Sequence, residues 1–552
     1  MGVELNLKEK SWQGFDGVWV LGRVVYNERV LAPKELKTIL EKSVVNGLVD
    51  LELLKSIIRR FRGFYSIIWI SANCTLLIAD TIRSYPLFFA KTGKDFALYD
   101  HLHAESSLSE LDESNIVEFA LTGFVTGPET LIKGVFQVQA GEFVLLNHST
   151  SEVKRVLYEY FAPEHPKIIE GVYEDTNFIK RLDKAVSVAT ERLVNYLDGR
   201  VAVIPLSGGW DSRTILLHLK RQGYPRILTF SYGKEGNSEA QISSDVARQL
   251  GVEWIFVPYR VNDWRAVAET SEYWKYIIYA HNGVSTPHIQ DFLAVRQMVR
   301  SGVLTSEDAV LIPGHSADFV AGSHLRREYG KIRKIEDLIN AIFAKHYTLI
   351  PYRLLHLHIP EVIELRREGE YLGKINKKLV NQARDYYKEI PFRDPYAFLD
   401  FWDWRERQAK FIVNSVKVYK FWGLDFWLPL WDQDFVRFWH SIPLEWRMDR
   451  ALYRKYLLSL QAEMNLKIPV TTKKARIKQA VKLFLQHAGL MTTFMKIQTS
   501  LLSARNLYDS HSLQWYGIWD RTSFNDLVSR AGGQINVNTL VTLDILKTLY
   551  LK

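Results

Sequence analysis

The segment that most constrains this chain is a glycine-containing loop placed directly after an apolar run. Residues 201–206 are VAVIPL, and residues 207–212 are SGGWDS. Two adjacent glycines let the backbone approach a ligand closely and adopt φ values that other residues avoid. The first N–H groups of a following helix lack internal partners and attract anions. The pattern therefore predicts a buried strand that delivers a phosphate-binding turn into a helix.

The polar residues of this loop indicate which phosphate compound it holds. Ser207 and Ser212 add hydroxyl donors, whereas Asp211 repels phosphate and suits Mg²⁺, a cation that prefers oxygen ligands. A Walker-type loop needs a lysine after its last glycine, so a kinase or GTPase is disfavoured. An ordinary strand-to-helix turn, capped by serine and aspartate, is the alternative. We interpret the loop as a site for ATP held through its β- and γ-phosphates.

Composition sets the outer limits on class and location. A chain of 552 residues with 47% hydrophobic and 24% charged residues is expected to hold two or more globular domains. A single cysteine, Cys74, excludes internal disulfides and fits a reducing compartment. No apolar stretch reaches the ~20 residues of a spanning helix, and residues 1–13 are too polar for a secretory signal. We therefore expect a cytoplasmic protein. The formal charge of +9 suits a polyanionic partner, either a nucleotide or a nucleic acid.

The order of apolar segments predicts two kinds of architecture. Short strands at 19–26, 64–70, 75–79 and 142–146, with a helical stretch at 33–48, indicate an α+β layered N-terminal domain. After about residue 177, strands and helices alternate, which favours a parallel sheet covered by helices. These later elements are a helix at 178–196, strands at 201–206, 226–231, 253–257 and 309–312, and helices at 212–221 and 238–250.

Domain boundaries follow from the same pass along the chain. Beyond about residue 335 the chain is mainly helical, and residues 162–175 form a polar, proline-containing stretch. We expect an N-terminal domain at 1–160, a linker at 161–176 and a second domain at 177–552.

A second polar turn follows the predicted strand 309–312. Gly314 and Gly322 permit close backbone approach, and Asp318 is a second carboxylate, 107 residues after Asp211. Ligands of open parallel sheets bind at the carboxyl ends of the strands, where both turns would lie. Asp211 and Asp318 can therefore share Mg²⁺ with a pyrophosphate group. A purely capping role for Asp318 is the alternative.

Taken together, these motifs resemble the asparagine synthetase family, which includes the β-lactam synthetases and lasso-peptide cyclases. Residues 207–212 match the family's pyrophosphate motif Ser-Gly-Gly-x-Asp-Ser, and 230–233 (FSYG) match the strand end that cups adenosine. Residues 314–322 resemble its Gly-Glu-Gly-x-Asp-Glu turn, and 428–432 (LPLWD) its Pro-Phe-Leu-Asp segment. In the N-terminal half, residues 63–66, 78–80, 86–89, 123–127 and 140–141 resemble the glutaminase domain.

The resemblance implies a fold, two cofactors and a set of site residues. The fold would be an Ntn-hydrolase-like layered domain followed by an ATP-pyrophosphatase domain with a helical C-terminal part, and the cofactors would be ATP and Mg²⁺. A lysine from the C-terminal region would stabilise developing charge; Lys474 is the candidate and Lys473 the alternate. The other implied roles are pyrophosphate binding by Ser207, Gly208, Gly209 and Ser212, Mg²⁺ binding by Asp211 and Asp318, and adenosine contacts by Leu206, Tyr232 and Gly314.

Departures from the family pattern are equally informative. A glutaminase domain of this type uses a cysteine directly after the initiator methionine, but position 2 is Gly2, so glutaminase activity is expected to be absent. His315 and Phe319 stand where the family carries acids. His315 is a candidate general base for an amine, with purely local hydrogen bonding as the alternative. Arg213 replaces a small polar residue and either contacts phosphate or lies on the helix surface.

Three functions fit this sequence. The first is an ATP-dependent ligase that activates a small-molecule or peptide carboxylate as an acyl-adenylate and transfers it to ammonia or an amine. The second is a glutamine-hydrolysing asparagine synthase, and the third an RNA-binding protein that modifies bases with ATP. The strand-rich N-terminal half lacks an aromatic RNA-reading signature, which disfavours nucleic acid as a partner. The resemblance allows a homodimer, and no membrane partner is expected.

Overall fold

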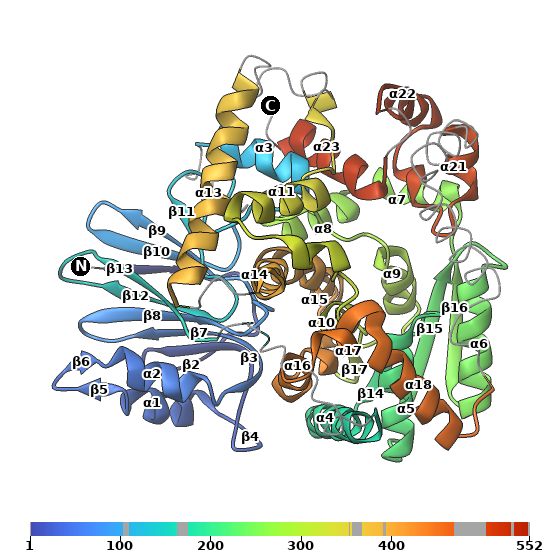
Figure 1. Cartoon of the computed structure of the whole chain (residues 1–552), viewed down its shortest axis with the longest axis horizontal. Helices are drawn as coiled ribbons and strands as arrows, with labels where there is room; N and C mark the ends of the chain where they lie inside the picture. The colour runs from blue at the N-terminus through green and yellow to red at the C-terminus, as the bar shows by residue number, and fades with distance from the viewer. Residues whose placement is uncertain are drawn as a thin grey trace.

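The computed structural model describes residues 2–102, 110–159, 161, 163, 175–352, 354–355, 367–389, 394–467, 504–531 and 535–549. We call the part up to residue 159 the N-terminal unit and the part from residue 175 the synthase unit. Figure 1 shows the strands of the N-terminal unit on one side and the second sheet, with α5 and α6, on the other. Among the described residues, no helix combines the length and the apolar character needed to cross a membrane.

The N-terminal unit contains two sheets that pack face to face. The larger has the order β13-β12-β8-β7-β3-β2, with β4 paired to β3, and the smaller has the order β1-β10-β9-β11. Side chains alternate between the two faces: Ile68 and Leu77 pack against Phe89 and Leu98 of the smaller sheet, whereas Ile67 faces the helices outside. The strands are β1 (Val3–Asn6), β2 (Gln13–Phe15), β3 (Val18–Tyr26), β4 (Arg29–Val30), β7 (Arg62–Ile70), β8 (Cys74–Ala79), β9 (Phe88–Thr92), β10 (Asp95–Tyr99), β11 (Val135–Gln137), β12 (Glu142–Asn147) and β13 (Val153–Leu157).

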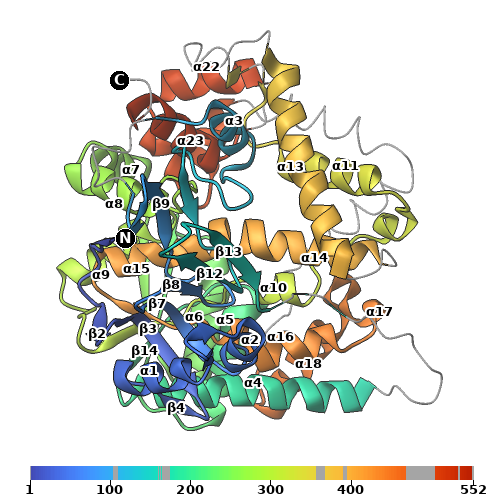
Figure 2. The ribbon, with the colours of Figure 1, turned by 90° about the vertical axis from the view of Figure 1, so that its left-hand side faces the viewer.

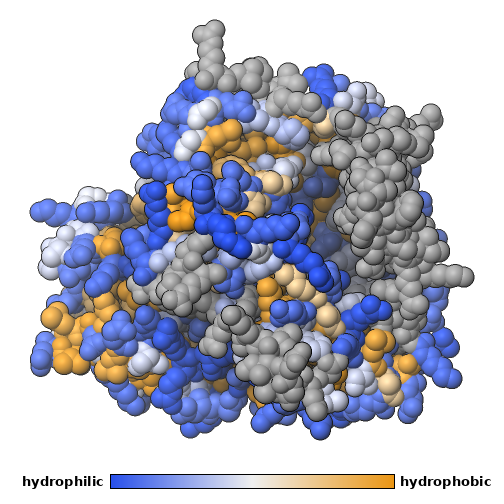
Figure 3. Space-filling view, viewed as in Figure 1, coloured by the Kyte–Doolittle hydropathy of each residue, from blue (hydrophilic) through white to orange (hydrophobic). Residues whose placement is uncertain are grey.

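Two helices cover the outer face of the larger sheet, and one of them is shorter than the sequence predicts. The helix α1 (Pro33–Glu41) ends well before residue 48, and α2 (Leu51–Ile58) follows it. Between them Asn46 and Gly47, both with positive φ, form the turn of a hairpin made by β5 (Val44–Val45) and β6 (Leu48–Val49). An Asn-Gly pair favours this kind of turn over continued helix. Val45 and Leu48 are exposed on the hairpin. Figure 3 shows apolar surface at the lower left, where Figure 1 places β5 and β6.

The synthase unit is built on a five-stranded parallel sheet with the order β16-β15-β14-β17-β18. The strands are β14 (Val201–Pro205), β15 (Ile227–Gly233), β16 (Glu253–Pro258), β17 (Ala309–Leu311) and β18 (Asp425–Phe426). The chain runs outward from β14 to β16 and then returns to the other side of β14 with β17. The order therefore reverses between β14 and β17, which is where open parallel sheets bind ligands. The predicted strand-helix alternation is confirmed, including a helix over Ser238–Leu250.

Helices enclose this sheet and join it to the N-terminal unit. Figures 1 and 2 both show α13 beside α3, where Lys378 Nζ lies 2.7 Å from Glu118 Oε2 of the N-terminal unit. The helices are α3 (Glu113–Thr122), α4 (Asp175–Leu197), α5 (Trp210–Arg221), α6 (Ser238–Leu250), α7 (Val261–Ala268), α8 (Ser271–His281), α9 (Phe292–Arg300), α10 (Ala317–Val320), α11 (Ile335–His346), α13 (Glu368–Glu389), α14 (Pro395–Trp402), α15 (Lys417–Phe421), α16 (Gln433–His440), α17 (Leu444–Arg447), α18 (Ala451–Glu463), α21 (Ala504–Ser510), α22 (Arg521–Ala531), α23 (Val537–Leu549) and the π-helix η3 (Asp403–Ile412).

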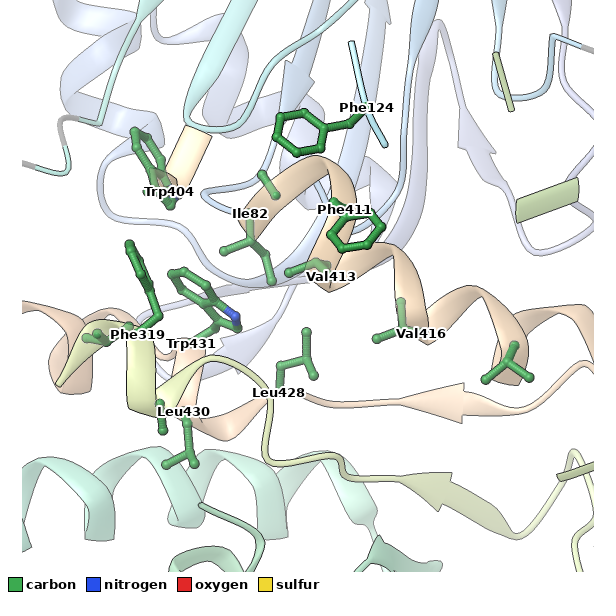
Figure 4. Close-up of a cluster of buried hydrophobic side chains, with 14 of the residues drawn as sticks. Ile82, Phe124, Phe319, Trp404, Phe411, Val413, Val416, Leu428, Leu430 and Trp431 are labelled. Carbon is green, nitrogen blue, oxygen red and sulfur yellow. The ribbon is translucent and has the colours of Figure 1, made fainter. Parts of the chain in front are cut away.

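One hydrophobic core runs through both units without interruption. In Figure 4, Ile82 and Phe124 of the N-terminal unit lie among Trp404, Phe411 and other apolar side chains of the synthase unit. Burial of this much apolar surface is the main favourable term in folding, at roughly 25 cal/mol per Å². The two units are therefore packed together as one body, and the sheet of the synthase unit is held in a fixed place relative to the N-terminal sheets.

Candidate active site

The loop after β14 has the geometry of an anion cradle. Gly209 is the N-cap of α5, with φ −75° and ψ 173°, so the N–H groups of the first helical turn point away from the helix. Ser207 Oγ accepts a hydrogen bond from the Gly209 N–H at 3.1 Å, and Ser212 Oγ accepts one from the Ser207 N–H at 3.3 Å. Ser207 and Gly209 are exposed at the surface of a cavity. The loop that the sequence singles out is thus ordered and open to a ligand.

The two aspartates meet at the end of this loop. The Asp318 N–H donates to Asp211 Oδ2 at 3.2 Å, although 107 residues separate them. They meet because β14 and β17 are neighbours, with Val203 in register with Leu311. Burial, and then the nearby Asp318 carboxylate, raise the pKa of Asp211 to about 7. Two acids that repel each other in this way form a site that a cation would stabilise.

The donor set suits a metal that arrives with phosphate. Among the described residues there is no group of three or more histidine, cysteine, aspartate or glutamate side chains that could hold a metal ion. Asp211 and Asp318 alone would leave most positions around Mg²⁺ open, and Mg²⁺ commonly combines one or two carboxylates with substrate phosphates and water. The carboxylate pair therefore fits Mg²⁺ bound together with a nucleotide.

A close backbone approach brings the second turn against the first. A Cβ atom on Gly314 would lie 2.6 Å from Ser212 N and 2.9 Å from Asp211 Cβ, which only glycine avoids. The neighbouring Ser316 adopts a left-handed conformation, with φ 63°, and donates a hydrogen bond from its hydroxyl to Gln408 Oε1 at 2.7 Å. Gln408 lies on the π-helix η3, a form that often marks functional sites. The turn is therefore fixed from both sides.

His315 lies on the same turn and lines the same cavity. Its ring nitrogens lie 3.3 Å from Ser415 Oγ. Burial, assisted by the neighbouring His288, lowers the pKa of His315 to about 3, so its imidazole is neutral at physiological pH. A base of such low pKa accepts protons poorly, because general bases work best with a pKa near the operating pH.

The cavity continues from the loops to a pocket suited to a nucleoside. The volume of the cavity is about 430 Å³, and its lining includes Leu206, Tyr232 and Gly314, to which the resemblance assigns adenosine contacts. The Tyr232 ring stacks on Tyr259 at 5.1 Å, and its hydroxyl donates to Asp291, which also accepts from Tyr419. Further lining residues that the sequence did not single out are Trp210, Glu239, Gln290, Asp291, Arg450 and Leu513.

Arg450 is the most informative residue that sequence reasoning missed. It lines the cavity, its positive charge acts on Asp211, and its guanidinium lies 4.5 Å from the centre of the Trp210 ring. Both Asp449 and Arg450 have left-handed backbone conformations, with φ 55° and 57°. Non-glycine residues are held in this way mainly where the surrounding structure compels it, often at functional sites. No local sequence pattern marks the segment Met448-Asp449-Arg450 as part of this cavity.

Two residues that the sequence associated with the site, Phe319 and Asp432, are not among those that line the cavity. Phe319 is buried and packs on Phe161 and Trp431 in the shared core, which explains why an acid is replaced there (Figure 4). Asp432 caps α16 and accepts from Arg192 Nη1 at 2.8 Å, so its role is structural. Lys474 and its alternate Lys473 lie outside the described residues.

Of the two alternatives for Arg213, the structure contradicts a place on the helix surface. Its side chain is 1% exposed and folds under the loop, where Nε donates to the Gly209 carbonyl at 2.8 Å and Nη2 to the Gly208 carbonyl at 3.1 Å. Because a trans peptide unit is planar, a carbonyl held inward turns the next N–H outward. Arg213 thereby fixes the orientation of the peptide units that follow Gly208 and Gly209, the first of which donates its N–H to Ser207 Oγ.

We expect Arg213→Met to weaken ATP binding through this loop. Loss of hydrogen bonds from a charged donor costs about 1.5–3 kcal/mol, equivalent to roughly a 10- to 100-fold rise in KM for ATP. Arg213→Lys, which keeps the charge, should show a smaller rise. The control is Arg221→Met on the same helix, where Arg221 instead pairs with Asp183 at 2.8 Å. Equal KM values in the Arg213→Met and Arg221→Met proteins would contradict the prediction.

Comparison with known proteins adds a family to this geometry. The family model "Asparagine synthase" matches residues 182–549. A putative glutamine-hydrolysing asparagine synthetase of Mycobacterium bovis is 24% identical over 308 residues, covering 50% of this chain and 45% of that protein. The microcin J25-processing protein McjC of Escherichia coli is 23% identical over 252 residues, covering 44% of each chain.

A shorter stretch of the chain is similar to a protein with a different name. A 7-cyano-7-deazaguanine synthase of Pseudomonas aeruginosa is 44% identical over 57 residues, which cover 10% of this chain and 25% of that protein. The chain spans less than half the length of each of these three curated relatives. The family model, in contrast, covers well over half of this chain. The chain therefore belongs to the asparagine synthase family.

Proposed function

We propose that this protein is an ATP-dependent ligase that forms amide bonds and releases AMP. A carboxylate oxygen of the substrate bonds to the α-phosphorus of ATP as the bond to the bridging oxygen breaks, giving an acyl-adenylate and pyrophosphate. The nitrogen of ammonia or an amine then bonds to the acyl carbon. The bond between this carbon and the phosphate oxygen breaks, AMP leaves with the electron pair of that bond, and the nitrogen loses a proton. The observation that carries the proposal is the meeting of Asp211 and Asp318 beside the Ser-Gly-Gly loop.

The roles of the residues follow from their places in the cavity. Ser207, Gly208, Gly209 and Ser212 would hold the pyrophosphate part, with the Arg450 guanidinium opposite Asp211. Asp211 and Asp318 would hold Mg²⁺, which would neutralise charge on the phosphates. Leu206, Tyr232 and Gly314 line the part suited to adenosine. This arrangement supports catalysis by charge stabilisation and positioning, which dominate in phosphoryl chemistry.

We further propose that the two units correspond to the domains of this family. The layered sheets of the N-terminal unit would be an Ntn-hydrolase-like domain over 1–160, and the parallel sheet an ATP-pyrophosphatase domain over 177–552. Cys74, the single cysteine of the sequence, is buried on β8, and its Sγ lies 3.3 Å from Ser71 Oγ. An internal, buried cysteine cannot supply the terminal nucleophile of a glutaminase. The nitrogen donor would then be ammonia or a substrate amine.

The reaction is tested by pyrophosphate exchange into ATP across a panel of carboxylic acids. The panel includes amino acids, sugar acids and peptides, since the similarity to a microcin-processing protein supports a peptide carboxylate. An acid that drives exchange, with AMP rather than ADP as product, supports the proposal and identifies the acyl substrate. Formation of ADP with every accepted acid would refute acyl-adenylate chemistry.

With the acyl substrate known, we expect ammonium salts or an amine to support amide formation and glutamine to fail. The reason is the absence of a usable cysteine nucleophile in the sequence. The measurement is glutamate release from glutamine beside product formation from ammonium at the same nitrogen concentration. Glutamate release at a rate matching product formation would instead indicate a glutamine-hydrolysing synthase.

For His315 we expect a role in orientation by hydrogen bonding, because its pKa of about 3 leaves it neutral over the working pH range. The variant His315→Gln keeps a neutral donor and acceptor and should change the rate by less than roughly 100-fold, the lower limit for loss of a general base. Its pH–rate profile between pH 6 and pH 9 should follow that of the unmodified protein. A fall in rate toward low pH in the unmodified protein that is missing in the variant would show that the imidazole takes the proton.

A further inference from the structure

A second cavity lies at the seam between the two units and shares no lining residue with the candidate active site. Its volume is about 220 Å³. Lys10, Arg23 and Tyr85 line it from the N-terminal unit, and Tyr196, Lys420 and Asp425 line it from the synthase unit. The seam cavity is therefore assembled only when the two units are docked.

The acid of the seam cavity is already neutralised. Asp425 Oδ2 accepts from Arg200 Nη1 at 2.8 Å, and its other oxygen lies 3.6 Å from Lys420 Nζ. Hydrogen bonding to Arg200 and the charge of Lys420 overcome the effect of burial and lower the pKa of Asp425. Asp425 is thus ionised, and Arg200 and Lys420 neutralise its charge. It is not available to neutralise the other positive side chains around the cavity.

Two further positively charged side chains, those of Lys10 and Arg23, line the cavity. Across the described part of the chain, no carboxylate lies within ion-pair distance of Lys10 or Arg23. The Arg23 Nη1 group donates only to the neighbouring Gly22 carbonyl, at 3.2 Å. Glu9, next to Lys10, instead accepts from the Tyr279 hydroxyl at 2.7 Å.

Arg23 interacts with a residue on the other side of the seam. Arg23 interacts electrostatically with the Tyr196 phenol of the synthase unit, which lies on the far wall of the cavity. A partly enclosed cleft in which one sign of charge is in excess concentrates counter-ions, because its low-dielectric walls focus the field. The Tyr85 and Tyr196 rings supply flat walls, and the volume limits the occupant to a compact molecule.

We propose that the seam cavity binds a small anion, a carboxylate or a phosphate, between Lys10, Arg23 and Lys420. The anion would bridge cations of both units and so stabilise their docking. Asp425 belongs to β18, which pairs with β17, the strand that leads into the turn carrying Gly314 and Asp318. The seam site is therefore one strand away from the second turn of the active site.

The test titrates the full chain with inorganic phosphate and, separately, with succinate, without Mg²⁺ or nucleotide. Ligand binding to the folded state raises Tm. We expect a rise of a few degrees with at least one anion, and a matching isotherm by calorimetry. The double variant Lys10→Gln/Arg23→Gln should bind at least tenfold more weakly. The control Lys91→Gln/Lys94→Gln removes the same charge from the β9–β10 hairpin.

A further variant separates the seam site from the phosphate loop of the active site. Arg450→Gln should lower phosphate binding at the active site only. The phosphate binding that remains in the Arg450→Gln protein must therefore disappear when Lys10 and Arg23 are replaced as well. Binding of phosphate alone or of succinate alone supports the proposal and identifies the anion class. Unchanged binding in the Lys10→Gln/Arg23→Gln protein, or no Tm shift with either anion, would overturn it. Lys10 is exposed, so Lys10→Gln alone serves if the double variant does not fold.

Discussion

Replacement of Asp211 by asparagine is expected to abolish acid-dependent pyrophosphate exchange while leaving the fold intact. The variant keeps the shape of the side chain but removes one of the two carboxylates at the end of the Ser-Gly-Gly loop. Metal-assisted charge stabilisation is worth several kcal/mol, so the exchange rate should fall by about 10²–10³-fold. The measurement is labelled pyrophosphate incorporation into ATP at saturating Mg²⁺ and acid.

The same variant should not lose stability, and this distinguishes a functional acid from a structural one. Burial and repulsion by Asp318 raise the pKa of Asp211, which means that its ionised form is disfavoured in the fold. Asparagine removes that penalty, so Tm without Mg²⁺ should equal or exceed that of the unmodified protein. Asp245→Asn, which changes an exposed acid on α6 paired with Arg248, is the matched control. Exchange in Asp211→Asn within about threefold of this control would rule out the proposed metal site.

The second large effect is expected from Gly314→Ala. The added methyl group would meet the Ser212 nitrogen at 2.6 Å and the Asp211 carbonyl carbon at 2.9 Å, both of them backbone atoms that cannot rotate away. Such overpacking costs about 1–3 kcal/mol of stability. It also separates the two turns, and a displacement of ~1 Å between reacting groups can cost about 10²-fold in rate.

The control for Gly314→Ala is Gly373→Ala, where no atom lies within 4 Å of the new methyl group. Because Gly373 lies inside α13, alanine there should keep or raise Tm. Unfolding by heat and pyrophosphate exchange are measured for both variants. Normal exchange in the Gly314→Ala protein would show that the turns tolerate separation and that the two aspartates need not meet.

How far the sequence predicts this molecule depends on how local each feature is. The strand 201–205 and the loop after it are set by neighbouring residues, and the structure confirms the strand and an open loop. The meeting of Asp211 with Asp318 follows from the parallel sheet, because both acids come after strand ends. The end of α1 was misplaced because the Asn46-Gly47 turn outweighed the helical pattern around it.

The remaining site residues depend on contacts between distant segments. Arg450 reaches the cavity because the segment before it is anchored by Arg447, which is fully buried and bonds Asp400 at 2.6 Å and the Val320 carbonyl at 3.0 Å. Asp291 is held by tyrosines from two other elements, Tyr232 and Tyr419. The sequence left the role of Arg213 open because a helical position alone does not show that a guanidinium folds beneath a loop. None of these contacts leaves a periodic or motif signal.

The order of strands in the parallel sheet has a consequence for how this architecture can diversify. The acids are held together by the ladder between β14 and β17, whereas residues 259–308 connect the far edge of the sheet back to its middle and bring Gln290 and Asp291 to the wall of the cavity. That connection can lengthen, shorten or acquire new recognition features without disturbing the spacing of the carboxylates. A lineage built on this plan is thus free to exchange the molecules it handles while inheriting one unchanged pair of aspartates.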